Sequence, residues 1–181
     1  MIRAQLDSNL ALEYTCNYLS LKTNKKAEAK NLRIFLPDGT DIKGAKVLLH
    51  ACCAPCSSAI IECMLKYGMI PTVYFCNPNI APLQEYEIRK QELIRFLKSQ
   101  NVPFVEAEYN HETWLNAVKG LENEPERGNR CSLCFELRLM SAAKYASENG
   151  FKWLTTTLQT MLPKSSPSWA DTMSASLRVQ N

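Results

Sequence analysis

The chain has 181 residues, of which 46% are hydrophobic and 22% are charged, and this ordinary globular balance argues against a disordered, collagen-like or coiled-coil protein. Its formal charge of +3, from 21 Lys and Arg against 18 Asp and Glu, is too small to indicate a nucleic-acid partner on its own. Since no stretch approaches the ~18 consecutive apolar residues of a bilayer span and the N-terminus lacks the apolar core of a signal peptide, we expect a cytoplasmic protein without a membrane partner.

The first 45 residues show no sustained hydrophobic period. Residues 36–44 contain the proline, glycines and aspartates that turns use to reach their special backbone angles. The segment also carries a lysine run that is more simply a solvated segment than an RNA-binding arm: Lys22, Lys25, Lys26 and Lys30. We therefore predict an irregular, peripheral extension over residues 1–45.

Short apolar runs and segments of helical period alternate over residues 46–158. In chain order they predict a strand at 46–50, a helix at 57–67, a strand at 72–76, a helix at 84–99, a strand at 102–106, a short helix around 114–118, a charged loop at 122–129, a longer helix ending at Gly150, and a strand within 151–158. Because parallel neighbours need crossover helices, this alternation predicts an α/β domain with a doubly wound, mainly parallel sheet and flanking helices. In such sheets, ligands bind at the C-terminal edge of the strands.

Beyond Leu158 the pattern fades. Residues 159–181 contain two prolines and five serines, and no apolar face recurs at any one period. We expect this segment to be a weakly ordered tail.

The chain contains eight cysteines, and five of them fall in two clusters. Cys52, Cys53 and Cys56 follow the first predicted strand, and Cys131 and Cys134 open the longer helix. Two C-x-x-C turns supply soft thiolates, the ligands of zinc or an iron–sulfur cluster, and a helix N-terminus favours the thiolate. The remaining three are more simply inert thiols: Cys16, Cys63 and Cys76.

Two alternatives compete with a metal centre built from both clusters. A structural zinc site usually places its cysteine pairs ~15–20 residues apart, whereas 74 residues separate Cys56 from Cys131. A thioredoxin-like redox pair fits Cys53 and Cys56 after a strand, but it leaves Cys52 and the second pair unexplained. A centre that uses both loops accounts for all five thiols, one more than a tetrahedral metal needs.

Five other polar residues lie near the predicted sheet edge. His50 precedes the cysteines and either donates to a sulfur or is a hydrogen-bonded structural residue. Tyr86 and Arg89 follow the exit of the second strand, with helix packing and a surface charge as their alternatives. Arg127 and Arg130 precede Cys131, where they can bind phosphate or belong to a solvated charge run.

With these residues in view, the chain resembles QueH, the cluster-containing epoxyqueuosine reductase family of queuosine tRNA modification. The resemblance runs from Val47 to Leu158. It is carried by five segments in the family's order: L-L-H-A-C-C-A-P-C-S at 48–57, N-P-N-I at 77–80 with E-Y and an arginine at 85–89, K-G-L-E and E-P-E within 119–126, R-C-x-x-C-F-x-x-R-L at 130–139, and T-T-T-L at 155–158.

The resemblance implies a Rossmann-like fold and the reductive removal of the epoxide oxygen from epoxyqueuosine in the tRNA anticodon loop. It also implies a 4Fe-4S cluster beside a mononuclear metal, expected to be iron, and an electron donor. The ligands carried over are Cys52, Cys53, Cys56, Cys131 and Cys134. We take His50, Tyr86 and Arg89 as candidate catalytic residues, and Arg127 and Arg130 as candidate tRNA contacts.

Two features depart from the family pattern. Asn110 follows Tyr109 where the family usually has an aspartate, and residues 159–181 replace the family's continuing segment as in a truncated or frameshifted C-terminus. We therefore expect impaired activity or tRNA binding. A metal-stabilised RNA-binding module without turnover, and a thiol oxidoreductase, remain the alternative functions.

Overall fold

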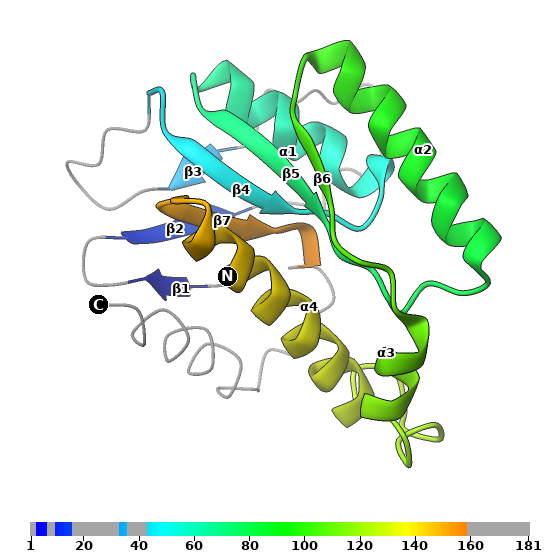
Figure 1. Ribbon diagram of the computed structural model, residues 1–181. Coiled ribbons are helices and arrows are strands. Elements are labelled where there is room, and N and C mark those ends of the chain that lie inside the picture. The colour runs from blue at the N-terminus through cyan, green and yellow to red at the C-terminus, as the bar shows by residue number, and fades with distance from the viewer. Residues whose placement is uncertain (1–2, 7–9, 16–32, 36–42, 159–181) are drawn as a thin grey trace, which may run out of the picture.

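The computed structural model describes residues 3–6, 10–15, 33–35 and 43–158, with side chains from residue 43 onward. Its centre is a sheet of four parallel strands in the order β6-β5-β4-β7 (Figure 1). The strands are β4 (Lys46–His50), β5 (Ile70–Phe75), β6 (Phe104–Glu106) and β7 (Trp153–Thr156), and the helices are α1 (Ala54–Lys66), α2 (Leu83–Gln100), α3 (His111–Ala117) and α4 (Asn129–Glu148). The predicted α/β fold is confirmed.

Alternate side chains of the inner strands enter two different cores. Val47 and Leu49 pack with Ile61 of α1 and Leu93 of α2 on one face. On the other face, Leu48 of β4 and Tyr74 of β5 pack with a row of α4 side chains spaced by three and four residues: Phe135, Leu139, Ala142 and Ala146. Helices therefore cover both faces, which is why these strands are apolar on both sides.

The direction of the crossovers changes at β4. From β4 the chain passes through α1 to β5 and through α2 to β6, and it then returns through α3 and α4 to β7 on the other side of β4 (Figure 1). Parallel strands that diverge in this way leave a crevice outside their C-terminal ends, and ligands of doubly wound folds bind there. The loops that follow β4 and β7 lie at this point.

Three short strands lie in the segment for which no regular elements were expected. β1 (Arg3–Leu6), β2 (Leu10–Thr15) and β3 (Arg33–Phe35) form a separate antiparallel sheet, so the extension is not irregular over these segments. Their sequences mix polar and apolar residues and contain no continuous run of bulky apolar residues like V-L-L in β4. The predicted tail at 159–181 and Cys16 lie outside the described residues.

The helix that follows the first central strand ends at a glycine, as predicted. Gly68 adopts a φ of +74°, a left-handed conformation that side-chain-bearing residues rarely adopt, and its N–H bonds the Leu65 carbonyl. Within the described part of the chain, the longest helices lack the run of apolar residues that crossing a bilayer requires.

Candidate metal centre

The centre of the site is the cysteine loop, residues 52–56, between β4 and α1. The sulfur atoms of Cys52, Cys53 and Cys56 all lie within 4.8 Å of one another, and those of Cys52 and Cys53 are 3.7 Å apart. Cys52 and Cys53 are partly buried and Cys56 is exposed. Three soft sulfur ligands on one loop can bind a metal ion or a metal–sulfur cluster.

The first turn of α1 leaves backbone donors for the sulfurs. Cys53 is the N-cap residue and Pro55 lies in the first turn, and the Cys53 side chain makes no capping hydrogen bond, so the first N–H groups of the helix face the loop. The Ser57 hydroxyl donates instead to the Cys53 carbonyl at 2.7 Å, which fixes the start of the helix. The helix N-terminus therefore favours negative charge on the loop.

Cys52 is the thiol of this loop that most readily ionises. A hydrogen bond from the Cys53 thiol, together with one from the Thr157 hydroxyl at 3.7 Å, lowers the pKa of Cys52 to about 5, although burial opposes the shift. The same Cys52–Cys53 bond raises the pKa of Cys53 far above its usual value, and burial raises the pKa of Cys56. A further hydrogen bond from Cys56 lowers the pKa of Cys52 in the same direction, so the contacts of the loop favour the thiolate at Cys52 over the other two sulfurs.

His50 is fully buried and both of its ring nitrogens are engaged. Nε2 donates to the Cys76 carbonyl at 3.1 Å, and Nδ1 accepts from the Thr156 hydroxyl at 2.9 Å, an arrangement that requires the neutral ring with its proton on Nε2. Burial, with the nearby charge of Arg138, lowers the pKa of His50 to about 3. These contacts match the structural alternative for His50, and a catalytic role for it remains a prediction.

The site also contains two buried polar residues to which sequence reasoning gave no role. Arg138 of α4 donates through Nε to the Cys76 carbonyl at 3.1 Å and through Nη2 to the Asn77 side-chain oxygen. Asn77 in turn donates to the Ala51 carbonyl at 3.0 Å. A signal was present, because Arg138 falls at helical spacing among the inward positions of α4.

The second cysteine pair lies at the start of α4. Cys131 is partly buried and accepts a hydrogen bond from the Arg127 backbone N–H at 3.4 Å, and Cys134 is buried. Burial raises the pKa of Cys76, and Cys134 adds to that shift. Cys131 and Cys134 thus occupy a helix N-terminus, as predicted, but neither belongs to the group of sulfurs within 4.8 Å of one another. Their role as ligands remains a prediction.

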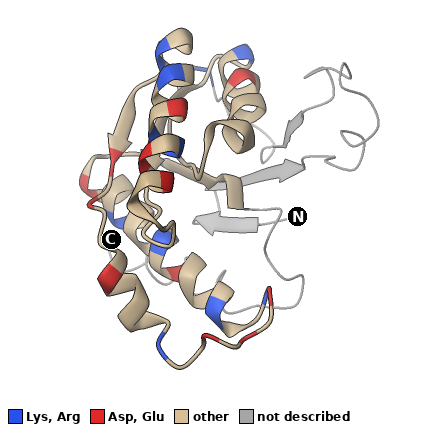
Figure 2. Cartoon of the chain, turned by 90° about the vertical axis from the view of Figure 1, so that its right-hand side faces the viewer, with Lys and Arg blue, Asp and Glu red and all other residues tan. Residues whose placement is uncertain are grey.

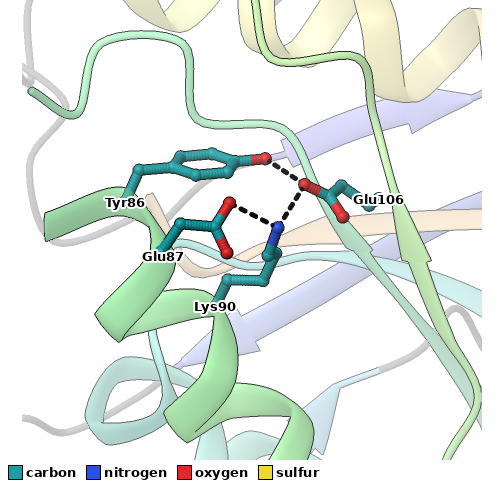
Figure 3. A network of polar contacts seen from close by, with 4 residues as sticks. All are labelled: Tyr86, Glu87, Lys90 and Glu106. Carbon is teal, nitrogen blue, oxygen red and sulfur yellow. Dashed lines mark hydrogen bonds and ion pairs between the residues drawn. The ribbon is translucent and has the colours of Figure 1, made fainter. Parts of the chain in front are cut away.

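Tyr86 and Arg89 lie on successive turns of α2 but in different surroundings. Tyr86 is 1% exposed, and its hydroxyl donates to Glu106 at 2.9 Å beside Lys90, which also bonds Glu106 (Figure 3). Burial and this carboxylate raise the pKa of Tyr86 above its usual range, so the hydroxyl keeps its proton. The arrangement matches the helix-packing alternative, and a catalytic role for Tyr86 remains a prediction.

Arg89 is closer to the cysteines. Its guanidinium pairs with Glu85 at 2.7 Å on the exposed surface of α2, and its charge lowers the pKa of Cys56 in part, against the larger opposing effect of burial. A hydrogen bond from Arg89 to Glu85 raises the pKa of Arg89, and the thiol groups of Cys53 and Cys52 add to that effect. Of the three candidate catalytic residues, Arg89 is the one that is solvent-accessible beside the loop.

The two arginines before Cys131 differ in their contacts. Arg130 donates to the Glu122 carbonyl at 3.2 Å, whereas the Arg127 guanidinium makes no hydrogen bond or ion pair with residues 43–158. Figure 2 shows basic and acidic residues interspersed on the described helices rather than gathered by sign. A phosphate contact by either residue remains a prediction.

Asn110, at the position where an aspartate is expected in the family, has a local structural role. Asn110 is the N-cap of α3, where its side-chain oxygen accepts a hydrogen bond from the Thr113 N–H at 2.8 Å. Tyr109 donates to the Ile80 carbonyl at 2.8 Å. An aspartate caps a helix equally well, so the asparagine preserves the capping bond while removing the charge.

Comparison with known proteins identifies the family. The model of the family described as "Epoxyqueuosine reductase QueH" matches residues 47–178. The chain belongs to this family.

Individual QueH proteins are similar to most of the chain. The epoxyqueuosine reductase QueH of Acinetobacter baylyi is 47% identical over 127 residues, which cover 70% of this chain and 56% of that protein. The QueH of Histophilus somni is 44% identical over 154 residues, covering 81% and 62% of the two chains, and that of Haemophilus influenzae is 49% identical over 126 residues, covering 70% and 50%. The matches thus span half to about three fifths of these relatives. The family match passes Leu158, and the predicted departure beyond it remains a prediction.

Proposed function

We propose that this chain reduces epoxyqueuosine to queuosine in the anticodon loop of tRNA; its relatives are named epoxyqueuosine reductases. The observation that supports the proposal is the meeting of three sulfurs within 4.8 Å at the sheet's topological switch point, in a chain of this family. Because the substrate is a tRNA, the proposed location is the cytoplasm.

The reaction determines what the site must supply. Two C–O bonds of the epoxide break, a carbon–carbon double bond forms, and the oxygen leaves as water, which consumes two electrons and two protons. A one-electron donor of low potential provides the electrons. A bound iron–sulfur cluster supplies electrons singly at low potential, and an adjacent metal polarises a C–O bond.

The donor set fits such groups. The proposed ligands of a 4Fe-4S cluster and a neighbouring mononuclear iron are Cys52, Cys53, Cys56, Cys131 and Cys134. The loop cysteines are already gathered, and the backbone donors at the start of α1 favour their ionised form. Cys131 and Cys134 would join them from the start of α4, which packs on the opposite face of the sheet from α1.

The chain's other residues divide between orienting the loop and meeting the substrate. His50 holds the ends of β4, β5 and β7 together through the Cys76 carbonyl and Thr156. We expect Arg89, which is exposed and paired with Glu85, to contact an anionic group of the substrate. Arg127, whose guanidinium makes no hydrogen bond or ion pair within residues 43–158, is the proposed phosphate contact.

Anaerobic turnover tests the proposal. The purified chain, supplied with iron, sulfide and a chemical reductant, is incubated with tRNA that contains epoxyqueuosine, and the nucleosides are analysed by mass spectrometry. We expect queuosine from the parent chain and from Cys63→Ala, a cysteine variant in the body of α1, and none from Cys53→Ala. Binding of tRNA by a colourless zinc protein without product would favour the RNA-binding module, and iron-free turnover with a thiol reductant would favour the thiol oxidoreductase.

A further inference from the structure

Arg138 is a charged residue in a place that usually holds an apolar one. It is 3% exposed and lies four residues after Cys134 on α4, among the inward-facing Phe135, Leu139 and Ala142. Burying a guanidinium costs several kcal/mol unless an anion compensates its charge. The position therefore calls for a negative partner.

No carboxylate within residues 43–158 provides that partner. The two acceptors of Arg138 are neutral oxygens, the Cys76 carbonyl and the Asn77 amide oxygen. The groups on which its charge acts are His50, Cys52 and Cys76, which surround the end of β4 and the cysteine loop. The guanidinium is therefore buried beside the cysteine loop with only neutral oxygens as hydrogen-bond acceptors among the described residues.

Arg138 also connects α4 to the cysteine loop through hydrogen bonds. Asn77 accepts from the guanidinium and donates to the carbonyl of Ala51, the residue directly before Cys52. The Cys76 carbonyl accepts from both Arg138 and His50. The helix that carries Cys131 and Cys134 is thereby tied to the strand exit that carries the other three cysteines.

We propose that Arg138 is a positioning residue of the metal centre, whose charge compensates the negative charge of a thiolate-bound metal–sulfur group and whose hydrogen bonds hold the cysteine loop against α4. The inference rests on the proposed function, because it requires that the loop hold such a group. It assigns no contact between Arg138 and the substrate.

A measurable consequence concerns the reduction potential. Adding an electron increases the negative charge of a thiolate-bound cluster, so a buried cation nearby stabilises the reduced form and raises the potential. Removing the charge should lower the potential even where iron remains bound. A residue that merely fills space would not produce this shift.

The test is an anaerobic redox titration of the iron-loaded full chain, followed by absorption and electron paramagnetic resonance. Arg138→Gln removes the charge, Arg138→Lys retains it, and Arg95→Gln removes an exposed arginine of α2 as the matched control. At one fixed solution potential, we expect Arg138→Gln to reduce the ratio of reduced to oxidised cluster by at least about tenfold, which equals about 59 mV for a one-electron couple. Arg138→Lys should stay within about threefold of the parent and Arg95→Gln should match it.

A parent-like ratio in Arg138→Gln, or an equal shift in Arg138→Gln and Arg138→Lys, would overturn the inference. Should Arg138→Gln fail to fold, Asn77→Asp makes the same test, because a carboxylate on the guanidinium cancels its charge; an unchanged ratio there would also overturn it. If the parent chain is active but the cluster ratio is unchanged in the variants, only the role of Arg138 is refuted. If the ratio changes in Arg138→Gln but the parent chain shows no turnover, only the reductase function is refuted. A parent chain that binds no iron refutes both.

Discussion

Removing one hydroxyl group from α2 separates a structural from a catalytic role for Tyr86. In Tyr86→Phe the ring keeps its neighbours, since Phe75 and Tyr109 lie with ring centroids 5.2 and 4.2 Å away, and only the 2.9 Å bond to Glu106 is lost. A hydrogen bond to a charged acceptor contributes about 1.5–3 kcal/mol. Glu106 is 37% exposed and still accepts from Lys90 at 2.9 Å, so water and Lys90 offset part of the loss. We expect the free energy of unfolding to fall by about 1 kcal/mol.

Urea denaturation of the metal-free chain measures this change, and a double-mutant cycle with Glu106→Gln isolates the bond between the two side chains. The cycle should give a coupling free energy of about 1 kcal/mol. Tyr67→Phe, at a 42% exposed tyrosine, is the control and should change stability by less than about 0.5 kcal/mol. Unchanged stability in Tyr86→Phe, together with a large loss of turnover, would refute the structural account and support a catalytic hydroxyl.

The remaining predictions concern the second cysteine pair, His50 and Arg127. Cys131→Ala and Cys134→Ala should each lose bound iron and sulfide, because a cluster short of a thiolate is open to solvent, while Cys63→Ala retains them; unchanged iron in the first two would exclude them as ligands. Since the pKa of His50 falls from 6.5 to about 3 on folding, the unfolded chain binds the extra proton between these values, and stability should rise with pH across that window by up to about 1.4 kcal/mol per unit. Denaturation of metal-free His50→Gln should show a shallower slope, and parallel curves for variant and parent would contradict it. Arg127→Ala should weaken tRNA binding and reduce the slope of log affinity against log salt by about 1, whereas an unaltered slope would remove Arg127 from the interface.

The sheet could be predicted from the sequence because its inner strands, β4 and β5, are buried over most of their length. The apolar run at 46–50 coincides with β4. The ends of β5 and α2 differ by one or two residues from the predicted ranges 72–76 and 84–99. The alternation of strands and helices was sufficient to place the cysteine loop at the C-terminal edge. The three N-terminal strands are as long as those of the central sheet, and they were missed because their sequences R-A-Q-L, L-A-L-E-Y-T and R-I-F mix charged or polar residues with apolar ones and lack a continuous run of bulky apolar residues like V-L-L in β4.

The contacts between the cysteine loop and distant parts of the chain could not be predicted in the same way. Thr157 reaches Cys52 because β7 pairs with β4 in a register that places Thr156 opposite His50, and no local pattern encodes that pairing. Arg138 reads as a surface charge by residue type, although its spacing on α4 places it inward. Whether Cys131 and Cys134 reach the loop depends on how α4 packs, which spacing along the sequence does not determine.

The most direct test of the central claim is the queuosine content of tRNA in a bacterium that lacks its own epoxyqueuosine reductase and expresses this chain. The parent chain should convert the accumulated epoxyqueuosine to queuosine, and Cys53→Ala, expressed to the same level, should leave epoxyqueuosine in place. Persistence of epoxyqueuosine with a folded, iron-containing parent chain would contradict the proposed function.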